Sequence, residues 1–144
     1  IEMFRKSAFA GVPESQFKMA LLAAEGKVSG GEKVAFNWYQ RAAEQGFRPA
    51  MFNLATMYYQ GEGTERDVKK AFGMYSQLAE EGEADAQFMV ARMMYEGLGT
   101  EKDVPKALEY FNKAAAGGNQ LAIQFIDMVR KKQNTQFVKI DGLE

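Results

Sequence analysis

The 144-residue sequence contains no cysteine and no histidine. These absences exclude disulfides, thiol chemistry, an imidazole base and the histidine or cysteine ligands of zinc and haem sites. Proline occurs only 3 times, too rarely for a proline-rich linker. Because 18 Lys and Arg face 19 Asp and Glu, there is no basic excess, and no nucleic-acid partner is expected. Long apolar runs are also lacking, so no membrane insertion is expected.

The sequence does contain a repeat with a period of 36 residues. Small residues and turns recur at this interval, which is the signature of a repeat architecture. The recurring elements are Gly46, Gly82 and Gly118; Ala50, Ala86 and Ala122; and the turns Gly61-Glu62-Gly63-Thr64 and Gly97-Leu98-Gly99-Thr100.

Each repeat has the pattern of two helices, called here A and B. In one repeat they are expected over about 48–60 and 67–81, where apolar residues recur every three or four positions. Asp67 and Asp103 stand where an N-cap is wanted, and Pro105 falls in the first turn of its helix. Helices of about 14 residues are marginal alone in water. Stacking of neighbouring repeats is therefore expected to supply the stability.

The sequence pattern of the repeats resembles that of the Sel-one-like repeat (SLR), a relative of the tetratricopeptide repeat. The resemblance covers about residues 1–132, and one B helix ends in a typical form, Trp38-Tyr39-Gln40-Arg41-Ala42-Ala43-Glu44-Gln45-Gly46. It implies an all-α fold, an α/α right-handed superhelical solenoid of helix-turn-helix repeats. It also implies protein–protein interaction without catalytic residues. Some family members carry paired cysteines in each repeat, and this sequence departs from that pattern.

The array is predicted to hold three full repeats flanked by partial units. Because helix B of the first partial unit has no A helix before it, further structure is expected upstream of Ile1. Asp127 and Arg130 replace small or aromatic residues of earlier repeats, as suits a C-terminal cap with a charged outer face. The predicted divisions are a half unit 1–10, repeats 11–46, 47–82 and 83–118, a capping helix 119–132, and a loose tail 133–144.

The partner-binding residues are predicted by analogy with tetratricopeptide proteins, in which one face of each A helix lines the concave groove. Aromatic side chains are frequent at these positions and carry much of the binding energy in such grooves. Ala24, Gln60 and Glu96 lie beside them. The predicted contacts are Phe17, Leu21, Phe52, Thr56, Tyr59, Phe88, Arg92, Tyr95, Gln124 and Met128.

The function expected from these observations is a non-enzymatic module that binds a partner protein or peptide in its concave groove. The resemblance is compatible with a bacterial adaptor, an envelope regulator or a toxin-inhibiting protein. It favours the periplasm or a secreted location slightly, and the cytoplasm stays open. Two alternatives stay open: a cell-wall-directed hydrolase that uses carboxylates, and a structural spacer in a longer repeat protein. No cofactor, metal or catalytic residue is predicted, and a monomer is expected.

Overall fold

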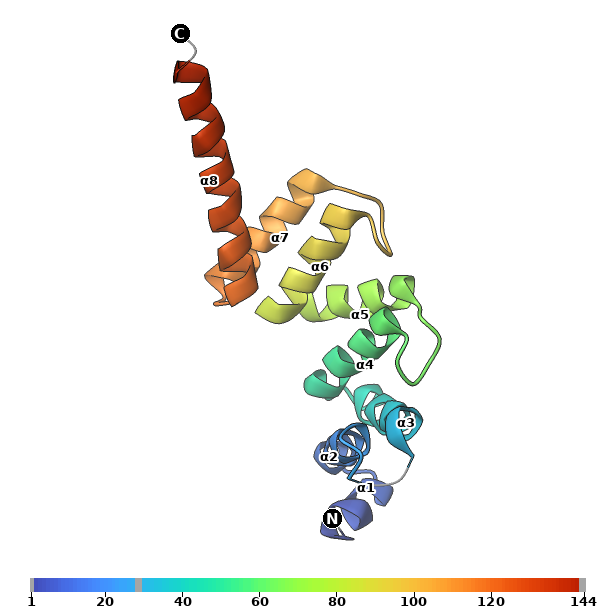
Figure 1. Cartoon of the computed structure of the whole chain (residues 1–144). Coiled ribbons are helices and arrows are strands. Elements are labelled where there is room, and N and C mark those ends of the chain that lie inside the picture. The colour runs from blue at the N-terminus through green and yellow to red at the C-terminus, as the bar shows by residue number, and fades with distance from the viewer. Residues whose placement is uncertain (1, 28–29, 143–144) are drawn as a thin grey trace. The chain divides into compact units, whose positions relative to one another are not determined.

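A computed structural model describes the backbone of residues 2–27 and 30–142, and side chains within these ranges from residue 3 to residue 133. The described residues form eight α-helices and no strand (Figure 1). The helices are α1 Glu2–Phe9, α2 Pro13–Ala24, α3 Gly31–Glu44, α4 Arg48–Gln60, α5 Val68–Glu80, α6 Ala84–Glu96, α7 Val104–Ala116 and α8 Gln120–Gly142.

The helices fall into two compact units, residues 1–78 and residues 79–144. In the first unit α1 packs against α2, α2 against α3, and α3 against α4. In the second unit α6 packs against α7, and α7 packs against α8. Each unit is therefore built from antiparallel helix pairs that are neighbours in the sequence, the arrangement that short connections favour.

The starts of α5 and α7 are fixed by the two predicted N-caps. The Lys70 backbone N–H donates to Asp67 Oδ1 at 3.0 Å, and the Lys106 N–H donates to Asp103 Oδ1 at 3.1 Å. Each carboxylate satisfies a backbone donor that has no partner inside the helix, which typically contributes about 1 kcal/mol. The prediction of these two caps is confirmed.

The ends of α4 and α6 need glycine. Gly61 and Gly97 follow these helices with φ of 73° and 72°, a left-handed conformation that side chains disfavour. Gly63 is needed for a second reason. A Cβ on it would collide with the backbone carbonyl of Glu32, so the turn after α4 lies directly against the start of α3.

The core of the first unit is made largely of alanine and aromatic side chains. Alanines at the helix contacts let backbones approach closely, and larger side chains fill the space between them. Phe9, for instance, meets the edge of Trp38 with ring centroids 5.1 Å apart. The fully buried alanines of this unit are Ala20, Ala23, Ala35, Ala42, Ala50, Ala55 and Ala71.

The core of the second unit is centred on Val90, Met93 and Phe111, which are almost fully buried. The close approach of α6 and α7 depends on Gly117. A Cβ there would lie 2.8 Å from the Cβ of Ala84, closer than two carbon atoms can pack. This glycine therefore sets how near the turn after α7 comes to the start of α6.

Helix α8 corrects one prediction. The segment from residue 133 was expected to be a loose tail, but the backbone is helical as far as Gly142, and residues 143 and 144 lie outside the described part. No proline or glycine interrupts residues 120–141, so the backbone hydrogen bonds can continue. Residues 133–142 lack an apolar stripe. Such a stripe marks the face by which a helix packs, and a helix can form without it.

The beginning of α8 is tied to α6 through Asn119. Its Oδ1 accepts the Ala122 N–H at 2.8 Å, and its Nδ2 donates to Asp85 Oδ1 at 2.9 Å. Asp127 and Arg130 of this helix are exposed, as expected for the outer face of the last helix. None of the described helices is both long enough and apolar enough to span a bilayer.

Candidate functional site

The ten predicted contact residues divide equally between the two units. The first unit holds Phe17, Leu21, Phe52, Thr56 and Tyr59, and the second holds Phe88, Arg92, Tyr95, Gln124 and Met128. In the first unit all five side chains are half-buried. The second unit presents a more open arrangement, in which Arg92, Tyr95, Gln124 and Met128 are exposed.

Phe17 on α2 belongs to the packing of the first unit. The Phe17 ring lies between two aromatic rings, with its centroid 5.7 Å from that of Tyr39 and 5.4 Å from that of Phe47. Contacts of this kind contribute about 0.5–1.5 kcal/mol beyond the buried area. Phe17 therefore joins α2 to α3 and to the start of α4.

Phe52 and Thr56 on α4 are both engaged by Tyr75 of α5. The rings of Phe52 and Tyr75 meet edge to face at 5.3 Å, and the Thr56 and Tyr75 hydroxyl oxygens are 2.7 Å apart. Thr56 Oγ1 also donates to the Phe52 carbonyl at 3.0 Å. Burial raises the pKa of the Tyr75 phenol, and the hydrogen bond to Thr56 opposes part of this rise.

Tyr59 near the end of α4 is covered on one side by Arg66. The Arg66 Nε–H donates to the Tyr59 carbonyl at 2.9 Å, and the guanidinium carbon lies 5.8 Å from the centre of the ring. The distance fits a cation–π contact, which is weak at an exposed site. One face of the Tyr59 ring is thus covered by Arg66, a residue of the turn that follows α4.

In the second unit all five predicted residues line one groove with a volume of about 420 Å³. They come from α6 and α8, with α7 between them in the sequence. Four further residues complete the lining. The groove is lined by Phe88, Arg92, Tyr95, Glu96, Phe111, Leu121, Gln124, Phe125 and Met128.

The floor of this groove is a cluster of aromatic rings. Phe111 and Phe125 stack with centroids 4.0 Å apart and planes inclined by 22°. Phe88 meets the edge of Phe111 at 5.8 Å, and Tyr95 meets that of Phe125 at 5.4 Å. Four rings from three helices hold one another in place, so the floor is rigid before any partner arrives.

The rim of the groove combines exposed apolar side chains with one ion pair. Tyr95 is 41% exposed, and Leu121 and Met128 are each 57% exposed. Arg92 Nε lies 3.4 Å from Glu96 Oε1, and both side chains are about half exposed. Large apolar side chains gathered on an exposed groove are characteristic of interaction sites.

The sequence analysis missed three residues of this groove: Phe111, Leu121 and Phe125. Transfer of the 36-residue period put Gln124 at the position of Phe88, whereas the aromatic ring that reaches the floor is on the next residue. The signal was present in the spacing of Leu121, Phe125 and Met128, which differ by four and three residues. Phe111 lies on a B helix, whereas the analogy with tetratricopeptide proteins considered only the A helices.

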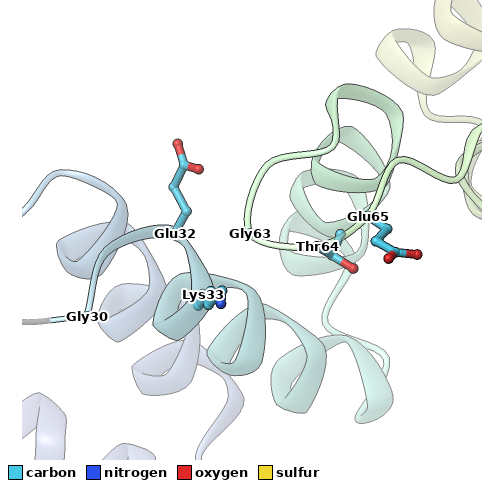
Figure 2. A pocket seen from close by; sticks show the side chains of 6 residues that line it. All are labelled: Gly30, Glu32, Lys33, Gly63, Thr64 and Glu65. Atoms are coloured by element: carbon cyan, nitrogen blue, oxygen red, sulfur yellow. The ribbon is translucent and has the colours of Figure 1, made fainter.

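One depression of the first unit offers few groups that could bind a ligand. Its volume is about 740 Å³, and it lies where the turn after α4 meets the start of α3. Figure 2 shows that the Glu32 and Glu65 side chains point away from each other instead of converging. Across the described ranges, no group of three or more acidic side chains is placed to hold a metal ion.

The geometry defines a class, the helix-turn-helix repeat proteins. The Sel1 repeat model matches residues 13–47, 48–83 and 84–119, which is more than half of the sequence. The chain therefore belongs to the Sel1 repeat family, as the resemblance predicted. A comparison with curated proteins gives no match.

Solved structures show the same fold. A Sel1 repeat protein from Oxalobacter formigenes is 31% identical, with a TM-score of 0.77 over 88% of this chain and 96% of that one. A protective antigen of uropathogenic Escherichia coli with an SLR fold is 30% identical, with a TM-score of 0.80 over 84% of this chain. The chain spans 26% of the length of that antigen. The cysteine-rich protein B of Helicobacter pylori is 21% identical, with a TM-score of 0.63 over 83% of this chain and 92% of that one, and shows the fold alone.

These similarities confirm an all-α repeat solenoid. Sel1 repeats generally mediate protein–protein interaction, and the family is generally non-catalytic. Membership of this family therefore indicates protein–protein interaction as the general class of function.

Proposed function

We propose that the groove between α6, α7 and α8 binds a segment of a partner protein. The observation that carries this proposal is the rigid aromatic floor under an exposed apolar rim. A partner side chain placed on the floor removes apolar surface on both sides from water. Because the floor is already ordered, the entropy cost of binding falls mainly on the partner.

The residues of the first unit have a different part in the proposal. Phe17, Phe52 and Thr56 are engaged by their own neighbours, so we assign them mainly to holding the fold. Leu21 and Tyr59 remain predicted contacts. The predicted monomer and the predicted absence of nucleic-acid binding also stay predictions. Sedimentation velocity and a gel-shift assay with mixed DNA test them.

The test compares two identical substitutions of exposed methionines. Met128→Arg places a charge on the groove, and Met3→Arg places the same charge on α1, where the side chain is 83% exposed. Each tagged variant and the wild type is used to capture proteins from lysate of the source cell, after circular dichroism has shown equal helix content. Captured proteins are identified by mass spectrometry and titrated against purified bait.

We expect a partner that binds wild type and Met3→Arg equally and binds Met128→Arg at least about tenfold more weakly, the size of effect of a binding hot spot. Equal binding to all three proteins would place the contact outside the groove and overturn the proposal. A turnover assay on cell-wall material tests the hydrolase alternative, which survives only if activity is found and an acid-to-amide variant loses it.

A further inference from the structure

The groove of the second unit has a chemistry that narrows the kind of partner. Its floor consists of Phe88, Phe111 and Phe125, with the ring of Tyr95 beside them. A carboxylate placed on these rings would lose its hydration without gaining a partner, whereas a large apolar side chain would remove apolar surface from water. The floor therefore favours a large apolar side chain of the occupant over a carboxylate. A volume of about 420 Å³ suits a few side chains of a short segment.

A second cation lies just beyond the groove along α8. Lys132 follows Met128 by four residues and Phe125 by seven, so it continues the face of α8 that lines the groove. It is not one of the lining residues, but it lies one helical turn beyond Met128 and is exposed. The lining itself holds one cation and one anion, Arg92 and Glu96, and Lys132 supplies a further positive charge next to it.

The ion pair on α6 leaves Arg92 able to bind a second acceptor. Its contact with Glu96 uses Nε at 3.4 Å, whereas a guanidinium carries five N–H donors. Both partners are about half exposed, so this pair contributes little by itself. A carboxylate from outside can join it without the loss of a strong internal contact.

The first unit lacks these charges at the equivalent positions. Arg92 and Glu96 correspond, 36 residues earlier, to Thr56 and Gln60. Thr56 is turned inward to the Tyr75 hydroxyl, so no cation stands on that face of α4 at this position. These charges are therefore a property of the second unit and not of the repeat as such.

We propose that the groove takes an acidic–apolar peptide segment of the partner protein. One aromatic or large aliphatic side chain lies on the Phe111–Phe125 stack, and an Asp or Glu within about one helical turn of it faces Arg92 and Lys132. This inference rests on the proposed function, because it names the chemistry of the segment that the same groove binds.

The first experiment selects the ligand from random sequences. A phage library of random 12-residue peptides is panned on the wild-type protein and, in parallel, on Met128→Arg and Met3→Arg. We expect sequences enriched on wild type and Met3→Arg to pair Phe, Trp, Leu or Met with Asp or Glu three to five residues away. Enrichment of basic or uncharged apolar sequences overturns the inference.

The second experiment measures the charge contribution on one selected peptide, labelled and titrated by fluorescence anisotropy. We expect Arg92→Glu to weaken binding about tenfold and Lys132→Glu about threefold, because each places a like charge opposite the peptide acid. Glu96→Gln removes the competing carboxylate and should strengthen binding about twofold. Lys69→Glu on α5, an exposed lysine outside the groove, is the matched control and should change nothing.

A charge-reversed peptide completes the set. With its acid replaced by Lys, the peptide should bind Arg92→Glu more tightly than it binds wild type. If Arg92→Glu and Lys69→Glu bind both peptides alike, the rim charges do not select the ligand and the inference is wrong.

The outcomes separate this inference from the proposed function. Peptides that bind wild type and Met128→Arg equally would show that the groove is not the site, and both proposals would fail, as they would if no peptide is enriched. Binding that is lost in Met128→Arg but indifferent to Arg92, Lys132 and Glu96 would overturn only the acidic preference. A dimer of the protein alone that Met128→Arg dissociates would make a second copy the occupant and also overturn the inference.

Discussion

Tyr75 in the first unit and Phe111 in the second are equivalent residues, 36 positions apart on helices α5 and α7. Both are almost fully buried, yet they face different partners. The Tyr75 hydroxyl pairs with Thr56, whereas the Phe111 ring stacks on Phe125 of the following helix. The same buried position thus serves two uses: a phenol that pairs with the hydroxyl of the preceding helix, and a phenyl ring that stacks on a ring of the following helix.

The comparison shows how equivalent positions of a repeat can differ without a change of fold. In the first unit Thr56 on the A helix pairs with the buried Tyr75 phenol, since a buried unpaired hydroxyl costs about 1–3 kcal/mol. Where the B helix carries Phe111, that demand is gone. The equivalent position on the A helix is then free to hold Arg92 at the surface.

The largest effect is expected from removing the shared ring. Phe111→Ala should lower the free energy of unfolding by about 3–5 kcal/mol, because it leaves a cavity under both Phe88 and Phe125. Urea unfolding followed by circular dichroism measures this loss. Phe111→Leu, which keeps most of the volume, should cost much less. A loss below about 1 kcal/mol for the alanine variant would mean that the floor is not the packed centre described above.

A smaller effect is expected from breaking the hydroxyl pair of the first unit. Thr56→Val should cost about 1–3 kcal/mol, because it leaves the buried Tyr75 hydroxyl without its partner. The double variant Thr56→Val/Tyr75→Phe should recover most of this loss, since it removes both polar groups. Additive losses in this double-mutant cycle, measured by urea unfolding, would show that the two hydroxyls are not coupled.

The N-caps offer a comparison in which the two units should agree. Asp67→Ala and Asp103→Ala should each cost about 1 kcal/mol, because both remove the same hydrogen bond to the third residue beyond. Asp→Asn at either position keeps an acceptor oxygen and serves as the control. Thermal unfolding of the four variants checks the expectation, and a cost confined to one unit would contradict it.

The effect of pH should be the smallest and should appear only in alkaline solution. Burial raises the pKa of Tyr75 above its ordinary value, so the neutral phenol stabilises the fold below pH of about 10. This stabilisation is lost as the pH rises through the higher pKa of the folded state. Tyr75→Phe should therefore show a shallower fall in stability above pH of about 10 than the wild type. Parallel slopes in urea titrations at alkaline pH would refute the assignment to Tyr75.

Much of the fold could be predicted from residues whose chemistry suits one structural role, such as an N-cap or a left-handed turn. Asp67 and Asp103 could be assigned as caps because their carboxylates have free backbone donors to meet, and Gly61 and Gly97 because the chain there turns left-handed. The tail after residue 132 was predicted wrongly, because the prediction relied on an apolar stripe, which marks a helix that packs by one face and which residues 133–142 lack.

The site was less predictable because it depends on contacts between elements. The period correctly selected five residues of the second-unit groove, including Arg92 and Tyr95. It could not show that Thr56 turns inward, because that depends on a hydroxyl on another helix. Nor could it find Phe125, since α8 meets α7 through a different residue from the one that the repeat specifies.

The position of Met128 has a consequence for how oxidation affects the protein. Thioethers oxidise according to their exposure, and conversion to the sulfoxide turns an apolar side chain into a polar one. Met128 is 57% exposed on the groove, whereas Met93 is fully buried in the core of the same unit. An oxidant at low dose will therefore modify the groove while the fold is still intact. If the groove binds as proposed, loss of binding will precede loss of structure, and methionine sulfoxide reductase will be able to reverse it.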